Sequence, residues 1–134
     1  MAVNSYRHLE LYFGISGLGA ILHTLNPRYS PDQLIYILNH AEDSVLIVDP
    51  TFIPLVESVQ DKLDTVETII IASAKDSIPE NNLKNVFSYE ELLKDELDEY
   101  NWPQLNEGDA ASLCYTSGTT GNPKGVLYSH RSTV

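Results

Sequence analysis

The sequence predicts an α/β fold in which βαβ units build a parallel sheet. Residues 44–48 and residues 68–72 are short apolar runs rich in β-branched side chains, and each is typical of a buried strand. Between them, residues 52–63 carry apolar side chains at helical spacing. Strand, helix and strand in direct succession predict a βαβ unit, which requires the two strands to be parallel.

A buried helix is expected earlier in the chain, over residues 6–23, which are mostly apolar or small. Glycines at positions 14, 17 and 19 weaken this prediction, because glycine lowers helix stability. The same glycines would allow another element to pack closely against the segment.

A loop is expected over residues 23–29, and a second helix follows it. Ser30 can cap this helix, Pro31 suits its first position, and Asp32 complements the positive end of the helix dipole. The apolar spacing beyond these residues gives the helix one buried face.

The stretch after the second strand is mostly polar. Residues 73–87 read as a loop, and Ser88 is expected to cap a short helix in which Glu91 completes a capping box. The acidic stretch 90–99 is interpreted as a solvated surface rather than a metal or partner site.

Trp102 stands before a proline and is expected to anchor a linker by packing its ring on the domain. The strand expected over residues 110–115 then leads directly into the segment that carries the chemistry. Cys114 on this strand is interpreted as a small buried hydrophobe. As the single cysteine it cannot form an internal disulfide, which favours a reducing, cytoplasmic compartment.

The charge of the chain restricts its partners. Its 134 residues suffice for one modest domain, and the net charge of −11 argues against non-specific nucleic-acid binding, which needs basic patches. A polyphosphate site here must therefore take its positive potential from local amides, a lysine or a metal. No apolar run reaches the roughly 18 residues of a membrane span, and no signal peptide is visible at the start.

A glycine- and hydroxyl-rich segment, YTSGTTGNPKGV, covers residues 115–126. Its glycines let the backbone turn tightly, and successive N–H groups of such a turn can point into one anion-binding concavity. Its threonine and serine hydroxyls add donors, and their oxygen atoms can also bind a metal. Lys124 adds one full positive charge, which binds phosphate as a point charge. The segment thus supplies the local positive potential that an acidic chain needs.

This segment differs from the Walker A loop, in which glycine and lysine are adjacent and a helix follows. Here Asn122 and Pro123 separate Gly121 from Lys124, and proline disfavours helical backbone in the residue before it. Residues 126–128 favour a strand. The expected geometry is therefore strand–loop–strand, with the loop as a flap over phosphates.

The motif YTSGTTGNPKGV resembles the signature loop of the adenylate-forming, or AMP-binding, enzyme superfamily, which includes acyl-CoA synthetases, luciferases and peptide-synthetase adenylation domains. A flexible linker rich in serine, threonine and glycine would not place a proline and a lysine between glycines and strands. Residues 17–49 and residues 128–131 also resemble bacterial fatty-acyl-CoA synthetases and related acyl-CoA ligases. The 3-methylmercaptopropionyl-CoA ligases are similar in the same segment.

The resemblance implies an ATP-dependent reaction in which a carboxylic acid, expected to be a fatty acid, becomes an acyl-adenylate and is then transferred to coenzyme A. It implies ATP, Mg²⁺ and coenzyme A as cofactors and co-substrates. Lys124 is the implied catalytic residue, because its charge would stabilise the phosphates, and Thr116 is the implied metal ligand. The residues implied in phosphate binding are Thr116, Ser117, Gly118, Thr119, Thr120, Gly121, Asn122, Pro123 and Lys124.

The resemblance further implies that residues 1–134 are part of the large N-terminal domain of an acyl-CoA synthetase. The βαβ region would cover about 1–100 and the phosphate-loop region about 108–134, with the C-terminal domain and the adenine, acyl and CoA sites outside this sequence. Such a piece is expected to be inactive alone, and the parent enzyme is expected to form a homodimer. The alternative from another class is a non-catalytic nucleotide-binding or scaffold module.

The histidines and Tyr115 are interpreted mainly as structural residues. His130 is expected to pack or cap rather than to act in catalysis, and His23 to support the core or a subunit contact. Tyr115 is expected to pack beneath the loop and fix its base, and both plain core and contact with the ligand remain open for its ring. His8 and His40 have no partner at metal-ligand spacing.

Overall fold

The computed structural model describes residues 1–116 and 121–133, and its contacts divide the chain into two compact units. The first unit comprises Met1–Val3 and Asn26–Leu97, and the second comprises Asn4–Leu25 and Asp98–Val134. Each unit contains one sheet of three strands together with helices, so the predicted α/β fold class is confirmed.

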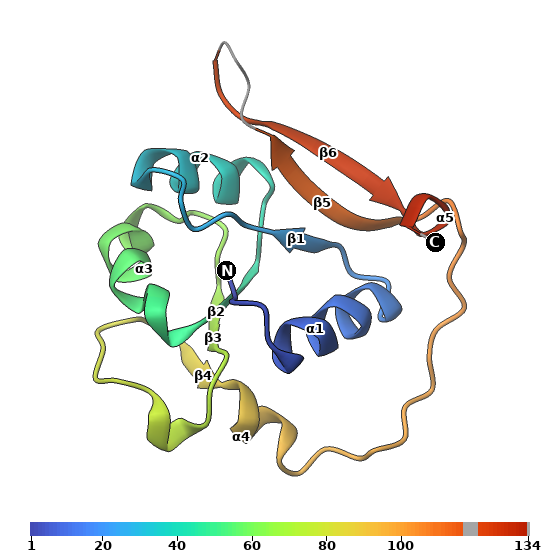
Figure 1. Ribbon diagram of the computed structural model, residues 1–134, viewed down its shortest axis with the longest axis horizontal. Coiled ribbons are helices and arrows are strands. Elements are labelled where there is room, and N and C mark those ends of the chain that lie inside the picture. Colours follow the sequence, from blue (N-terminus) through green and yellow to red (C-terminus); the bar gives the residue numbers. More distant parts are fainter. Residues whose placement is uncertain (117–120, 134) are drawn as a thin grey trace. The chain divides into compact units, whose positions relative to one another are not determined.

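The first unit holds the predicted βαβ arrangement. Its sheet has the order β2-β3-β4 with all neighbours parallel, and Figure 1 shows α2 and α3 beside each other within this unit. The crossover between β2 and β3 is a helix flanked by two short 3₁₀ turns rather than the single helix expected over residues 52–63. The elements are α2 (Pro31–His40), β2 (Val45–Val48), η1 (Pro50–Phe52), α3 (Ile53–Val59), η2 (Gln60–Lys62), β3 (Thr68–Ile71), η3 (Lys75–Ser77), β4 (Val86–Ser88) and α4 (Tyr89–Leu93).

Apolar side chains from α2, α3 and alternate positions of β2 and β3 form the core of this unit. Burial of each such side chain contributes roughly 1.5–3 kcal/mol. The buried residues are Leu34, Ile37, Leu38, Leu46, Val48, Ile53, Val56, Val59, Ile69 and Ile71.

The cap of α2 agrees with the sequence. The Ser30 side chain accepts a hydrogen bond from the Gln33 backbone N–H, and the Gln33 side chain accepts one from the Ser30 N–H, which completes a capping box. The short helix α4 has half of the expected arrangement, because the Ser88 hydroxyl accepts from the Glu91 N–H.

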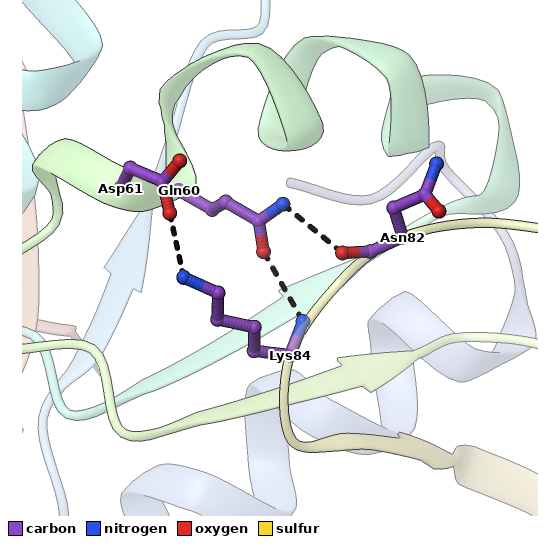
Figure 2. A network of polar contacts seen from close by, with 4 residues as sticks. All are labelled: Gln60, Asp61, Asn82 and Lys84. Atoms are coloured by element: carbon purple, nitrogen blue, oxygen red, sulfur yellow. Dashed lines mark hydrogen bonds and ion pairs between the residues drawn. The ribbon is translucent and has the colours of Figure 1, made fainter.

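The prediction of a loop over residues 73–87 was wrong at its end, where β4 begins at Val86. The approach to β4 is held by the side-chain amide of Gln60, which donates to the Asn82 carbonyl and accepts from the Lys84 N–H, at 3.2 and 3.1 Å (Figure 2). The Lys84 ammonium also pairs with Asp61 at 2.7 Å. A three-residue strand reached through such long-range side-chain contacts leaves little local signal in the sequence.

The second unit has the strand order β1-β5-β6, in which β1 is parallel and β6 antiparallel to β5. Figure 1 shows β5 and β6 as a long paired ribbon with β1 alongside β5. The elements are α1 (Tyr6–Gly17), β1 (Leu22–Thr24), β5 (Ala110–Thr116), β6 (Lys124–Ser129) and α5 (His130–Thr133).

The predicted buried helix over residues 6–23 was wrong in its extent and in its burial. The helix ends at Gly17, because Gly19 adopts a positive φ of 82°, and the chain then enters strand β1. None of the residues of α1 is buried, and Phe13 is 67% exposed.

The close approach expected at the glycines is confirmed at two of them. A Cβ placed on Gly17 would lie 2.5 Å from the ring of Trp102, and one on Gly19 would lie 2.9 Å from Leu105. Trp102 therefore packs its ring on α1, as the linker-anchor interpretation predicts.

Candidate phosphate-binding site

The β5–β6 pair carries the glycine- and hydroxyl-rich segment between its two strands. The strands pair from Ala110 opposite Ser129 to Thr116 opposite Lys124, so both flanks of the segment are regular strand. This confirms the predicted strands on either side of the loop and the absence of a helix directly after Lys124. Four of the predicted binding residues, Ser117, Gly118, Thr119 and Thr120, lie outside the described residues.

Thr116 and Lys124 are the last pair of the ladder. Residues directly opposite in an antiparallel pair place their side chains on the same face, so the threonine hydroxyl and the lysine ammonium project from one side of the ribbon. Both residues are exposed. Within the described residues no carboxylate lies at ion-pair distance from Lys124. The lysine charge is therefore available to an anion.

The return into β6 runs through Gly121, Asn122 and Pro123. Gly121 has a positive φ of 104°, a conformation that favours glycine. Apart from its chain neighbours, no described residue has an atom within 4 Å of the position where its Cβ would stand. Gly121 and Asn122 are exposed, whereas Pro123 is buried. A left-handed glycine in a glycine-rich turn is the backbone conformation found in anion-binding concavities.

The β1 strand supports the β5 strand up to the start of the segment. Thr24 is in register with Cys114, and the threonine oxygen lies 3.0 Å from the cysteine sulfur. Cys114 is half-buried and engages a hydroxyl, so the prediction of a fully buried hydrophobe was wrong in degree.

On the opposite face of the ribbon, the ring of Tyr115 covers Gly125. A Cβ placed on Gly125 would lie 3.2 Å from Cζ of the Tyr115 ring. The imidazole of His23 also contacts that ring, with the two centroids 5.2 Å apart. The Tyr115 ring thus packs on Gly125 beside Lys124, in agreement with the packing role expected for it.

His23 lies in strand β1 and not in the expected loop over residues 23–29. The sequence offers no clear signal of this position, because Leu22, His23 and Thr24 are one apolar residue followed by two polar ones and do not alternate. The contact with Tyr115 joins residues far apart in the sequence, so local pattern does not reveal it.

Other candidate ligands do not gather at the ribbon. Among the described residues no group of three or more His, Cys, Asp or Glu side chains has the geometry of a metal site. His130 begins α5, donates its backbone N–H to the Asp109 carbonyl at 3.0 Å, and is half-buried, in agreement with a packing role. Arg131 pairs with Glu107 and further ties α5 to the start of β5. No helix in the described part of the chain is long and apolar enough to span a bilayer.

The comparison with protein families identifies the class of this protein. The sequence model of the AMP-binding enzyme family matches residues 1–134, so the chain belongs to that family. The match confirms the resemblance seen in the loop and extends it to the whole chain.

Individual relatives are acid–CoA ligases. The chain is 53% identical over its full length to a 3-methylmercaptopropionyl-CoA ligase of Ruegeria pomeroyi and covers 25% of that protein. It is 46% identical to a medium-chain-fatty-acid–CoA ligase of Ectopseudomonas oleovorans and covers 24% of it. The chain therefore spans about a quarter of the length of these curated relatives.

A solved structure shows the same fold. The crystal structure of an anthranilate CoA ligase in complex with anthranoyl-AMP is 31% identical to this chain, with a TM-score of 0.86. The match covers 98% of this chain and 24% of that chain. Both βαβ unit and strand–loop–strand ribbon thus belong to the known architecture of CoA ligases.

Proposed function

We propose that this chain is the phosphate-binding part of an ATP-dependent, AMP-forming acid–CoA ligase. The observation that carries the proposal is the pairing of Thr116 with Lys124 at the end of an antiparallel ribbon, on both sides of a glycine- and hydroxyl-rich loop. Membership of the AMP-binding family and 53% identity to a CoA ligase support the same reaction. On this view, residues 1–134 form part of a larger N-terminal AMP-binding domain.

The proposed reaction has two group transfers. In the first, a carboxylate oxygen of the acid bonds to the α-phosphorus of ATP, and the bond from that phosphorus to the bridging oxygen of the β-phosphate breaks. Acyl-adenylate forms and pyrophosphate leaves with the electron pair. In the second, the thiolate of coenzyme A bonds to the acyl carbon, and AMP leaves. Charge develops on pyrophosphate in the first step, so donors placed around it lower the barrier.

Lys124 is the proposed charge partner of the β- and γ-phosphates. Its ammonium is exposed, projects from the same face as the Thr116 hydroxyl, and is held at the first position of a strand rather than in a mobile tail. Gly121 and Asn122 are proposed to present backbone N–H groups, with Pro123 fixing the turn into β6. The remaining proposed binding residues are Ser117, Gly118, Thr119 and Thr120.

Mg²⁺ is the proposed metal, and when bound it would neutralise phosphate charge as a Lewis acid. Magnesium usually keeps several waters and binds through substrate phosphates together with one or two protein oxygens. The exposed Thr116 hydroxyl, beside Lys124, suits this role. Thr116 is therefore the proposed protein ligand.

The acid is proposed to be a fatty acid, and a short thioether acid is the second candidate. The identity of 53% to a 3-methylmercaptopropionyl-CoA ligase favours the second candidate, and that of 46% to a medium-chain-fatty-acid–CoA ligase favours the first. Acid-dependent exchange between ATP and pyrophosphate, measured with both acids on the complete protein that contains this chain, distinguishes them. A homodimeric state and a cytoplasmic location of that protein are further predictions.

ATP titration of the 134-residue chain by calorimetry, with and without Mg²⁺, tests phosphate binding. We expect Lys124→Ala to weaken Mg²⁺-ATP binding by about tenfold or more, the loss typical of a charge-assisted hydrogen bond. Lys84→Ala is the matched control, because it removes the same charge from an exposed lysine that pairs with Asp61. If Lys124→Ala and Lys84→Ala bind Mg²⁺-ATP with equal affinity, phosphate binding by the loop is excluded.

Turnover separates a ligase from a non-catalytic nucleotide-binding module. Since the chain spans about a quarter of its curated relatives, we expect it to bind Mg²⁺-ATP without catalysing acid-dependent ATP–pyrophosphate exchange by itself. The complete protein should catalyse this exchange. A complete protein that binds ATP but shows no exchange with any carboxylic acid would favour the non-catalytic module.

A further inference from the structure

The end of the β5–β6 ribbon extends past its third strand. β1 ends at Thr24, opposite Cys114, so its pairing stops before the ladder reaches Tyr115 and Thr116. Among the described residues, β6 is the strand that pairs with this last part of β5. A two-stranded ribbon is only marginally stable by itself. Side-chain contacts are therefore needed to fix the positions that flank the loop.

The side chain of His23 reaches beyond the end of β1 to supply such a contact. In the β1–β5 pairing His23 is in register with Leu113, and Tyr115 stands two positions further along β5 on the same face. Diagonal neighbours of this kind are within reach of aromatic side chains. The two ring centroids are 5.2 Å apart with an interplanar angle of 37°, so the rings are in contact.

The contact continues from Tyr115 to the strand that carries the lysine. The Tyr115 ring lies so close to Gly125 that an added Cβ would stand 3.2 Å from Cζ and 3.3 Å from Cε2. Gly125 is opposite Tyr115 in the ladder and directly follows Lys124. One row of contacts thus joins His23 of β1, Tyr115 of β5 and Gly125 of β6.

We propose that His23 is a positioning residue for the phosphate loop. Its ring contacts the Tyr115 ring, the Tyr115 ring holds Gly125 in place, and Gly125 in turn positions Lys124. This inference rests on the proposed function and adds a residue that lies far from the loop in the sequence. Its ring holds the ladder end, while the phosphate contacts are made by the loop itself. The contact between the two rings carries this role.

Two substitutions and one control separate positioning from general stability. His23→Ala removes the ring, and His23→Phe keeps an aromatic ring of similar size at the same place. His40→Ala is the matched control, because His40 stacks on Tyr36 of α2 with the same centroid separation of 5.2 Å, in a pair that is not part of the ribbon. Dispersed amide spectra establish that each variant is folded.

The first measurement needs no ligand. Amide hydrogen exchange rates are measured by NMR in two parts of the β5–β6 ladder. The ladder end comprises residues 115–116 and 124–125, and the ladder middle comprises Leu113 and Leu127. We expect His23→Ala to accelerate the slowly exchanging amides of the ladder end by about twofold to tenfold relative to the middle, which is the factor typical of one aromatic contact. His23→Phe and His40→Ala should keep the rates of the unsubstituted chain. Unchanged rates in His23→Ala, or the same acceleration in His40→Ala, would overturn the proposal.

The second measurement is titration with inorganic pyrophosphate in the presence of Mg²⁺. We expect His23→Ala to weaken binding by about twofold to tenfold, and His23→Phe to restore it. Weaker binding with unchanged exchange would show that His23 acts in another way and overturns the proposal. If the unsubstituted chain binds no pyrophosphate, the proposed phosphate site fails, and the exchange rates still decide whether His23 orders the ribbon. If His23→Ala is unfolded, the test rests on His23→Phe. Faster amide exchange at the ladder end of that folded variant would overturn the proposed role of the ring.

Discussion

The ring of Tyr115 lies directly over Gly125, the residue opposite it in the β5–β6 ladder. A glycine next to Lys124 thus has a packing reason. Without a Cβ, the strand that carries the lysine can pass close under an aromatic ring.

Gly125→Ala should destabilise the chain. The new Cβ would stand 3.2 Å from the Tyr115 ring and 3.3 Å from Leu113, so the ring must move from its place. We expect a loss of about 1–3 kcal/mol in the free energy of unfolding, measured with urea. Gly14→Ala is the control, since apart from the helix's own backbone no described residue lies within 4 Å of its Cβ position in α1, and it should stabilise by about 0.5–1 kcal/mol. Equal effects of the two substitutions would contradict the packing of Tyr115 on Gly125.

Gly17→Ala should displace Trp102. The added Cβ would lie 2.5 Å from Cζ3 of the indole ring, a distance that real contacts do not reach. Trp102 is the single tryptophan, so its fluorescence reports on this site alone. We expect the emission maximum to shift to longer wavelength as the ring becomes more exposed, whereas Gly14→Ala should leave the spectrum unchanged. An unchanged spectrum in Gly17→Ala would mean that the indole does not pack on α1.

Gln60→Ala should loosen the approach to β4. The amide of Gln60 makes two hydrogen bonds to the backbone of residues 82 and 84, and its loss leaves both groups without that partner (Figure 2). We expect a destabilisation of about 1–3 kcal/mol and faster amide exchange in β4. Asp61→Asn breaks the neighbouring ion pair with Lys84. Both side chains of this pair are 77% exposed, so the substitution should change the free energy of unfolding by less than about 0.5 kcal/mol. A larger loss of unfolding free energy in Asp61→Asn than in Gln60→Ala would contradict this prediction.

Ser30→Ala should weaken α2 at its first turn. The serine hydroxyl accepts from the Gln33 N–H, so the substitution removes one half of the capping box. We expect a loss of about 1 kcal/mol in unfolding free energy, within the range found for N-cap serines. Ser58→Ala is the control, because this exposed hydroxyl only donates to the Leu55 carbonyl within α3. A Ser58 effect as large as that of Ser30 would argue against the cap as the cause.

The local sequence pattern was sufficient to predict most helices and strands of the first unit. The β-branched runs at residues 45–48 and 68–71, the helix between them and the Ser30 cap follow from periodicity and capping chemistry, which act over a few residues. The same holds for the strands on either side of the glycine- and hydroxyl-rich loop, whose proline excludes a helix at that point. These features depend on backbone preferences that each short segment carries with it.

The sequence by itself thus determined the class of fold, the family and the segment that carries the proposed chemistry. The tertiary structure decided that the helix α1 ends at Gly17, that β4 pairs with β3, and that His23 belongs to a strand beside β5. These outcomes depend on contacts between distant segments, such as that between Thr24 and Cys114, which are separated by 90 positions. No local preference encodes such a pairing, because its free energy arises only when the two strands meet.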